Sequence, residues 1–369
     1  MSSLSRRTAL KLLAAGTSLV SGGRDSSSSA ADVAPAKSDS APFESNWHRT
    51  NDRVWLGGEF WANPMEDWRI VDGAAECQTT GGDRNIHLVT RQITDVSGTF
   101  EMSVRVEQVE GRRQDGGAGF RIGVKSEINE HRSNVFAKSG VRAGLVGDQL
   151  LLGRGTKKLD VTDAAKNCVL ELTGKPIDDR YSLTLTARDG KSGDTLGTIT
   201  QSVPVDYVLG NVCVVSNFDA QIKKGAGARY RFRNWTASGS AFTVAPEQQF
   251  GPILWSMYTL SDSRSKEGFV LKLSALTGPL GEKDNKSVEL LVEKEGTWKS
   301  LGTADLDTDA WTATFRIPNW DQKSASSYRL VYRERHTDGS HADAEWSGTI
   351  KAEPEGRALR LGALTCQND

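Results

Sequence analysis

The sequence predicts an all-β protein built from two sandwiches, and three observations lead to this prediction. Apolar and polar residues alternate with a period of two over 100–106, 181–187 and 230–235, which is the pattern of half-buried antiparallel strands. Helical periodicity is almost absent. The chain has 369 residues, 37 of them glycine, which is enough chain for two cores with glycine at the turns.

The first strand-rich block covers residues 43–242. Further strands are expected at 117–124, where small residues allow close packing of sheets, and at 212–215, a continuous apolar run typical of a central strand. About 200 residues of short strands favour a large sandwich over an immunoglobulin-sized one.

Short motifs in this block resemble those of the concanavalin-like jelly-roll family. The motifs are an opening strand with a Trp and an Asp-Gly pair (67–73), the alternating strand 100–106, the Ala-Gly-Phe-Arg-Ile strand 118–122 and the closing Phe-Arg-Asn-Trp strand 232–235. The resemblance implies the sandwich found in laminin-G modules and in many lectin and glucanase domains. It implies little about the ligand.

A second block covers residues 251–353, after a change of composition at 245–247. Five strands are expected in it, at 269–275, 287–293, 297–301, 311–317 and 328–333. Strands at this spacing in about a hundred residues favour a smaller immunoglobulin- or fibronectin-like sandwich.

The N-terminus has the composition of a targeting segment. Arg6 and Arg7 precede a short, mildly apolar stretch, which is typical of a secretion signal. The segment resembles the twin-arginine pattern S-R-R-x-F-L-K, with Ala9 in place of Phe. We therefore expect a signal peptide over 1–31 and a disordered linker over 32–42. The resemblance implies export by the twin-arginine translocase to the periplasm or the cell exterior.

Charge and hydropathy exclude two classes of partner. The 46 basic and 47 acidic side chains nearly cancel, whereas nucleic-acid binding needs a basic excess to displace counterions. No apolar run approaches the roughly 20 residues that span a bilayer, so no membrane span is predicted.

No catalytic motif is present in the sequence. The five histidines form no H-E-x-x-H pattern, and neither a G-x-S-x-G elbow nor a phosphate-binding loop occurs. Jelly-roll glucanases place paired carboxylates on one strand as E-x-D-x-x-E; this run is missing, which makes a glycosidase the weakest hypothesis. We predict no catalytic residues and no cofactor site in this chain.

Tryptophans are the candidates for ligand contact. Trp55, Trp61 and Trp68 could stack on a sugar ring of an extracellular polysaccharide or glycan, although core packing is the favoured role for each. The four cysteines fit no zinc or redox spacing. A Cys168–Cys213 disulfide and a buried free thiol at Cys213 remain alternatives.

The last residues, 357–369, follow a Glu-Pro-Glu-Gly linker and read as the start of another domain. Their Leu-Arg-Leu and Thr-Cys-Gln segments resemble the opening strand of PhoD-like alkaline phosphatases and phosphodiesterases, in which an immunoglobulin-like domain precedes the metallophosphatase. The resemblance implies that Cys366 is an iron ligand, and that iron and calcium serve a catalytic domain whose other ligands lie beyond Asp369.

Two functional hypotheses follow. In the first, the chain is the non-catalytic N-terminal portion of an exported PhoD-like metallophosphatase acting on phosphate esters, whose catalytic domain is absent from this chain. In the second, it is a complete secreted carbohydrate-binding or adhesion protein.

Overall fold

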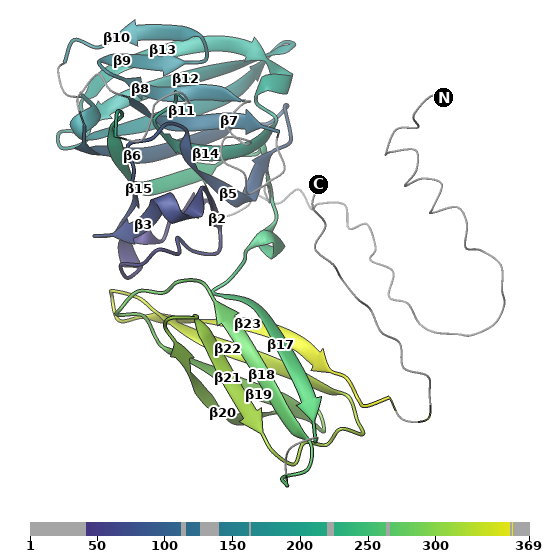
Figure 1. The fold of residues 1–369 in the computed structure, drawn as a ribbon. Helices are drawn as coiled ribbons and strands as arrows, with labels where there is room; N and C mark the ends of the chain where they lie inside the picture. Colours follow the sequence, from purple (N-terminus) through teal and green to yellow (C-terminus); the bar gives the residue numbers. More distant parts are fainter. Residues whose placement is uncertain are drawn as a thin grey trace, which may run out of the picture. The chain divides into compact units, whose positions relative to one another are not determined.

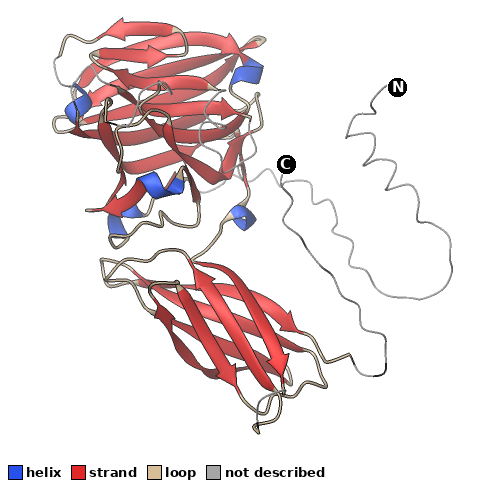
Figure 2. Cartoon of the chain, viewed as in Figure 1, coloured by secondary structure: helices blue, strands red, loops and turns tan. Residues whose placement is uncertain are grey.

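The computed structural model describes residues 42–111, 116–125, 140–161, 164–219, 225–262, 266–354 and 356. These residues are almost entirely strands joined by loops, and the helices among them are single short 3₁₀ turns (Figure 2). No helix in the described ranges is long and apolar enough to cross a membrane. The predicted all-β class is confirmed.

Two eight-stranded antiparallel sheets form the first sandwich (Figure 1). The first sheet has the order β13-β12-β11-β6-β15-β4-β3, with β1 paired to β15. Its strands are β1 (Phe43–Glu44), β3 (Trp68–Val71), β4 (Ala74–Cys77), β6 (Phe100–Glu110), β11 (Cys168–Ile177), β12 (Arg180–Asp189), β13 (Thr195–Pro204) and β15 (Arg229–Ser238).

The second sheet has the order β10-β9-β8-β7-β14-β5-β16, with β2 paired to β5. Its strands are β2 (Phe60–Asn63), β5 (Arg84–Ile93), β7 (Gly117–Val124), β8 (Val141–Val146), β9 (Gln149–Leu152), β10 (Gly155–Lys158), β14 (Gly210–Ser216) and β16 (Phe242–Val244).

Alternation along each strand decides which side chains enter the core between these sheets. On β6, Met102, Val104 and Val106 are buried in the shared hydrophobic cluster, while the residues between them face away from it because successive side chains point to opposite faces. The partner sheet contributes Ile86, Leu88, Phe120 and Val214, among others, to the same cluster. The first sandwich thus consists of two facing antiparallel sheets around one continuous core, the large sandwich that the sequence predicts.

A seven-stranded sheet folds over on itself to make the smaller sandwich. Its strands are β17 (Ile253–Ser261), β18 (Val270–Thr277), β19 (Ser287–Lys294), β20 (Thr297–Asp307), β21 (Thr312–Ile317), β22 (Ser326–Arg335) and β23 (His341–Ile350). Strand β20 pairs with β19 for most of its length and with β21 only at Leu306 and Asp307. Its turn from one layer to the other encloses a second core that includes Leu271, Leu290 and Tyr332, the immunoglobulin-like arrangement that was predicted.

Candidate functional site

The three candidate tryptophans lie in different environments. Trp68 is fully buried in the core of the first sandwich. Trp55 is 4% exposed and packs in the second core, with the Arg53 guanidinium 4.6 Å from its ring centroid. Neither ring has surface on which a sugar could stack. Trp61 is half-buried and packs against Phe250 with ring centroids 5.9 Å apart.

Trp61 lies at the end of a row of side chains on the outer face of the second sheet. In register across the strands, Trp61 on β2 lies opposite His87 on β5, which lies opposite Cys213 on β14, and this residue lies opposite Arg121 on β7. These positions alternate with the core positions, so they face away from the main hydrophobic cluster. His87, Cys213 and Arg121 are nonetheless buried.

Two asparagines hold the His87 ring. Nδ1 contacts Oδ1 of Asn211, and Nε2 lies 2.9 Å from Oδ1 of Asn85; a neutral imidazole donates a hydrogen bond to one of these two oxygens. Both amides are fixed in this orientation, because the Nδ2 of Asn211 donates to the Leu88 carbonyl and the Nδ2 of Asn85 donates to the Asp83 carbonyl. Burial lowers the pKa of His87 to about 4. The hydrogen bond between the His87 ring and the Asn211 Oδ1 acceptor opposes this shift.

A buried ion pair lies beside the histidine. Arg121 Nη1 and Asp83 Oδ1 are 2.9 Å apart, and each side chain is 3% exposed. Burial raises the pKa of Asp83, and the Arg121 charge opposes that rise. A charged pair of this kind needs both partners to offset its desolvation. We therefore regard this group as a network that positions the strands beneath Trp61.

The outer face of the first sheet differs, because its polar side chains reach the solvent. One row crosses five strands in register, from Thr200 on β13 through Thr184, Thr173 and Glu101 to Ser238 on β15. Neighbouring hydroxyls on this face are hydrogen-bonded: Thr184 to Thr200 at 3.0 Å, Thr186 to Thr198 at 3.1 Å and Ser103 to Thr236 at 2.9 Å. We call this surface the hydroxyl face.

A depression of about 490 Å³ opens in the hydroxyl face. Its polar lining consists mainly of Glu101, Thr173, Lys175, Ser182, Thr184 and Ser238. Beneath it the inward-facing Gly174 has no side chain, and a Cβ there would meet the Phe100 ring at 2.3 Å. The volume lies within the roughly 300–1,000 Å³ of small-molecule sites, and the lining combines donors and acceptors with one carboxylate and one ammonium group.

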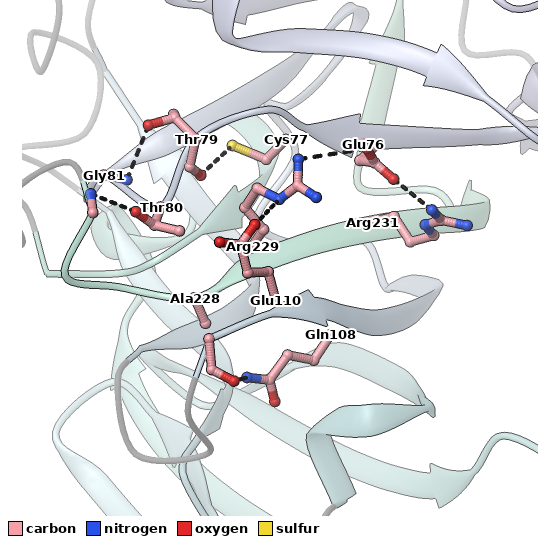
Figure 3. A network of polar contacts seen from close by, with 12 residues as sticks. Glu76, Cys77, Thr79, Thr80, Gly81, Gln108, Glu110, Ala228, Arg229 and Arg231 are labelled. Carbon is pink, nitrogen blue, oxygen red and sulfur yellow. Dashed lines mark hydrogen bonds and ion pairs between the residues drawn. The ribbon is translucent and has the colours of Figure 1, made fainter.

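Towards the other end of β6 and β15 the hydroxyls give way to charged residues. Glu76 on β4 lies opposite Arg231 on β15 and opposite Arg69 on β3. Its carboxylate is 2.5 Å from Arg231 Nη2 and 2.7 Å from Arg69 Nη2, and its side chain is only 1% exposed. Arg229 lies 3.8 Å from the same carboxylate and 3.0 Å from Glu110 (Figure 3).

The charged surface continues on the neighbouring positions of β6 and β15. Glu107 is 3.3 Å from both Arg105 and Arg233, and Arg105 donates a second contact of 2.9 Å to Asn167. We call these positions the arginine rows: Arg69, Arg105, Arg229, Arg231 and Arg233, with Glu76, Glu107 and Glu110.

Cys77, Cys168 and Cys213 are free and buried, which decides the disulfide alternative in favour of the buried thiol. Burial raises the pKa of Cys77 to about 11 and that of Cys168 and Cys213 to about 12. Such thiols are inert rather than nucleophilic.

No group of three or more His, Cys, Asp or Glu side chains suited to a metal ion occurs in the described ranges. The residues expected to carry export and iron binding, Arg6, Arg7 and Cys366, lie outside those ranges.

Comparison with known proteins gives matches at the level of structure alone. No family model matches the sequence, and no curated protein matches it. Among solved structures, a lectin UEA-II complexed with galactose matches with a TM-score of 0.39 at 15% identity, over 55% of this chain and 99% of that chain. Lectin II from Ulex europaeus matches with a TM-score of 0.39 at 14% identity, over the same shares. A legume lectin-like domain from Entamoeba histolytica matches with a TM-score of 0.35 at 10% identity, over 48% and 89%.

Proposed function

We propose that this chain is a carbohydrate-binding protein without catalytic activity of its own, and that its ligand lies in the depression of the hydroxyl face. The observation that carries the proposal is an open cavity of about 490 Å³ in which half of the described lining residues are Ser or Thr. A hydroxyl both donates and accepts hydrogen bonds, so a lining of this kind can match the mixed donors and acceptors of a sugar ring.

Binding is favoured over hydrolysis because the depression has a single carboxylate in its described lining, Glu101. Glycoside hydrolysis ordinarily uses two carboxyl groups, about 5–5.5 Å apart in retaining enzymes and about 6.5–9.5 Å apart in inverting ones. Lys175 and Glu101 can orient a ligand, but one carboxylate cannot serve as both acid and nucleophile or base.

A polymer suits this surface better than a single sugar. The hydroxyl row extends across β13, β12, β11, β6 and β15, and adjacent strands are about 4.8 Å apart, so the row is longer than one ring. Each sugar contact replaces contacts with water and contributes little net free energy. Repeated units along one chain raise the overall affinity through effective concentration.

The experiment is a polysaccharide co-sedimentation assay with the purified chain, followed by titration with oligosaccharides of increasing length from any polymer that is bound. We expect affinity to rise with the number of sugar units until the row is filled. Failure to retain the protein on any member of a broad panel of neutral and acidic polysaccharides would remove the basis of the proposal.

The narrower hypothesis, a non-catalytic N-terminal portion of an exported PhoD-like metallophosphatase, remains a proposal that rests on Arg6, Arg7 and 357–369. On this hypothesis the carbohydrate-binding sandwich would hold the parent enzyme at an extracellular polymer. Genomic DNA beyond the codon for Asp369 tests it: an open frame with Asp-, Asn- and His-rich metallophosphatase motifs supports it, and their absence in every frame contradicts it.

A further inference from the structure

The arginine rows share one surface with the hydroxyl face. Outward positions of β6 run from Glu101 and Ser103 to Arg105 and Glu107, and the antiparallel β15 runs beside them from Ser238 and Thr236 to the arginines. A chain lying over the hydroxyl rows therefore reaches guanidinium groups within a few residues along these two strands. Neighbouring outward positions on one strand are only about 6.8 Å apart.

The arginine rows carry an excess of positive charge. Five arginines are arranged around three glutamates, so two guanidinium charges are not balanced within the group. The Glu76 carboxylate is buried by Arg69 and Arg231, and its two oxygens already accept a hydrogen bond from each of them. Arg229 lies farther from this carboxylate, at 3.8 Å, and pairs more closely with Glu110, at 3.0 Å.

The side chains of the arginine rows are partly exposed, although that of Glu76 is not. The side chain of Arg69 is 42% exposed and that of Arg105 is 32% exposed, against 1% for Glu76. Guanidinium groups present a rigid fork of donors that matches the geometry of carboxylates and of other planar or tetrahedral oxyanions. The surface thus offers accessible, partly unneutralised donors beside hydroxyls.

From this juxtaposition we infer that the ligand of the hydroxyl face is an acidic polysaccharide, whose carboxylate or sulfate groups bind to the arginine rows. This inference rests on the proposed carbohydrate-binding function and adds the charge of the ligand to it. Neutral sugars would use the hydroxyl face alone, whereas an acidic polymer would use both surfaces and bind more tightly.

The probes are pairs of polymers with the same backbone and different charge. Polygalacturonate is compared with its methyl ester, and dextran sulfate with dextran, in titrations of the full chain. We expect at least one acidic member to bind about fivefold more tightly than its neutral counterpart at about 20 mM NaCl, and this preference to shrink at about 200 mM as screening increases.

A double variant, Arg69→Gln with Arg105→Gln, tests the residues. Glu76 keeps Arg231 and Glu107 keeps Arg233 in this variant, so each carboxylate retains an ion-pair partner and the variant should fold, with a lower melting temperature than the wild type. Should the double variant not fold, Arg105→Gln alone replaces it, because that substitution leaves Glu76 and its arginines untouched. The control is Arg333→Gln in the smaller sandwich, which also removes an exposed, ion-paired arginine.

The outcomes separate the two proposals. The inference is supported if the arginine variant no longer binds the acidic polymer more tightly than its neutral counterpart while Arg333→Gln still does. The polymer pair that shows this loss identifies carboxylate or sulfate as the bound anion. Equal binding of charged and neutral members overturns the inference and leaves the carbohydrate-binding function standing. Absence of binding to all four polymers and to the broader panel overturns both.

Discussion

Glu76 on β4 and Arg231 on β15 lie directly opposite each other in the first sheet, and their side chains form a 2.5 Å ion pair in which the carboxylate is 1% exposed. Two more arginines, Arg69 and Arg229, are arranged around the same carboxylate. Together these residues join β3, β4 and β15 on the outer face, beside the surface that we propose binds carbohydrate.

Removing the carboxylate should therefore destabilise the first sandwich. Glu76→Gln removes the negative charge shared by Arg69, Arg229 and Arg231 and weakens the charge-assisted hydrogen bonds from Arg69 and Arg231, and a hydrogen bond to a charged group contributes about 1.5–3 kcal/mol. Denaturant unfolding measures this cost. Glu345→Gln, which removes a half-exposed partner of Arg329, is the control and should change stability by less than about 1 kcal/mol. Equal effects of the two substitutions would contradict this account of Glu76.

The same carboxylate predicts a dependence of stability on acid pH. Burial raises the pKa of Glu76, but hydrogen bonds and charges from Arg69 and Arg231 outweigh it, so the pKa lies below its ordinary value of 4.5. Ionised Glu76 thus stabilises the fold above pH 4.5, and this contribution is lost as the pH falls through the lowered pKa that Glu76 has in the folded state. The wild type should lose more stability below pH 4.5 than Glu76→Gln does; parallel pH profiles would rule this out.

The burial of His87 predicts a second effect of pH on stability, at higher pH than the effect of Glu76. Burial lowers its pKa to about 4 from the ordinary 6.5, so the unfolded chain takes up a proton between pH 6.5 and 4 that the folded chain does not. Stability should fall over this interval as the pH decreases. In NMR spectra, the His87 imidazole signal is identified as the one that is missing from the His87→Gln variant. This signal should titrate with a midpoint near pH 4. A midpoint near pH 6.5 would show that the ring is not buried as the structure describes.

The buried thiols predict slow modification of the native protein. Cys77, Cys168 and Cys213 are buried and have raised pKa values, and the thiolate is the reactive form. In a Cys366→Ser variant, a disulfide reagent such as DTNB should label three thiols rapidly in denaturant and react far more slowly with the native fold. Rapid labelling of the native variant would indicate that these strands open readily.

The hydroxyl face predicts which substitutions abolish binding. Thr184→Tyr places a bulky ring in the depression at a strand position where Tyr is well tolerated, so it should remove polysaccharide binding with little change in melting temperature. Thr259→Tyr makes the same change at an exposed position of β17 in the smaller sandwich and should bind normally. Undiminished binding by Thr184→Tyr would show that the ligand binds outside the depression, and Trp61 would be the next residue to test.

Local sequence patterns were sufficient to predict the strands. The alternating segments 100–106, 181–187 and 230–235 lie within β6, β12 and β15, and the small-residue segment 117–124 coincides with β7. A difference arises at Trp311, where a strand was expected to begin. Its φ of 54° places it in a turn, and β21 begins at Thr312.

The candidate site could not be predicted in the same way. Thr184, Glu101 and Ser238 meet only because β12, β11, β6 and β15 pair in one register, and pairing between segments so far apart in the chain leaves no local pattern. Sequence reasoning offered tryptophans as the candidate ligand contacts while favouring core packing for each, and Trp55 and Trp68 are buried in the two cores. The outward Thr-x-Thr spacing in β12 and β13 was the available signal for the hydroxyl face.

The carbohydrate-binding proposal is tested most directly by titrating polygalacturonate and its methyl ester into the wild-type chain and into Thr184→Tyr. The account predicts saturable binding by the wild type, stronger for the charged polymer, and no binding by Thr184→Tyr. Identical heats for wild type and variant, or no binding of either polymer and of the wider polysaccharide panel, would contradict it.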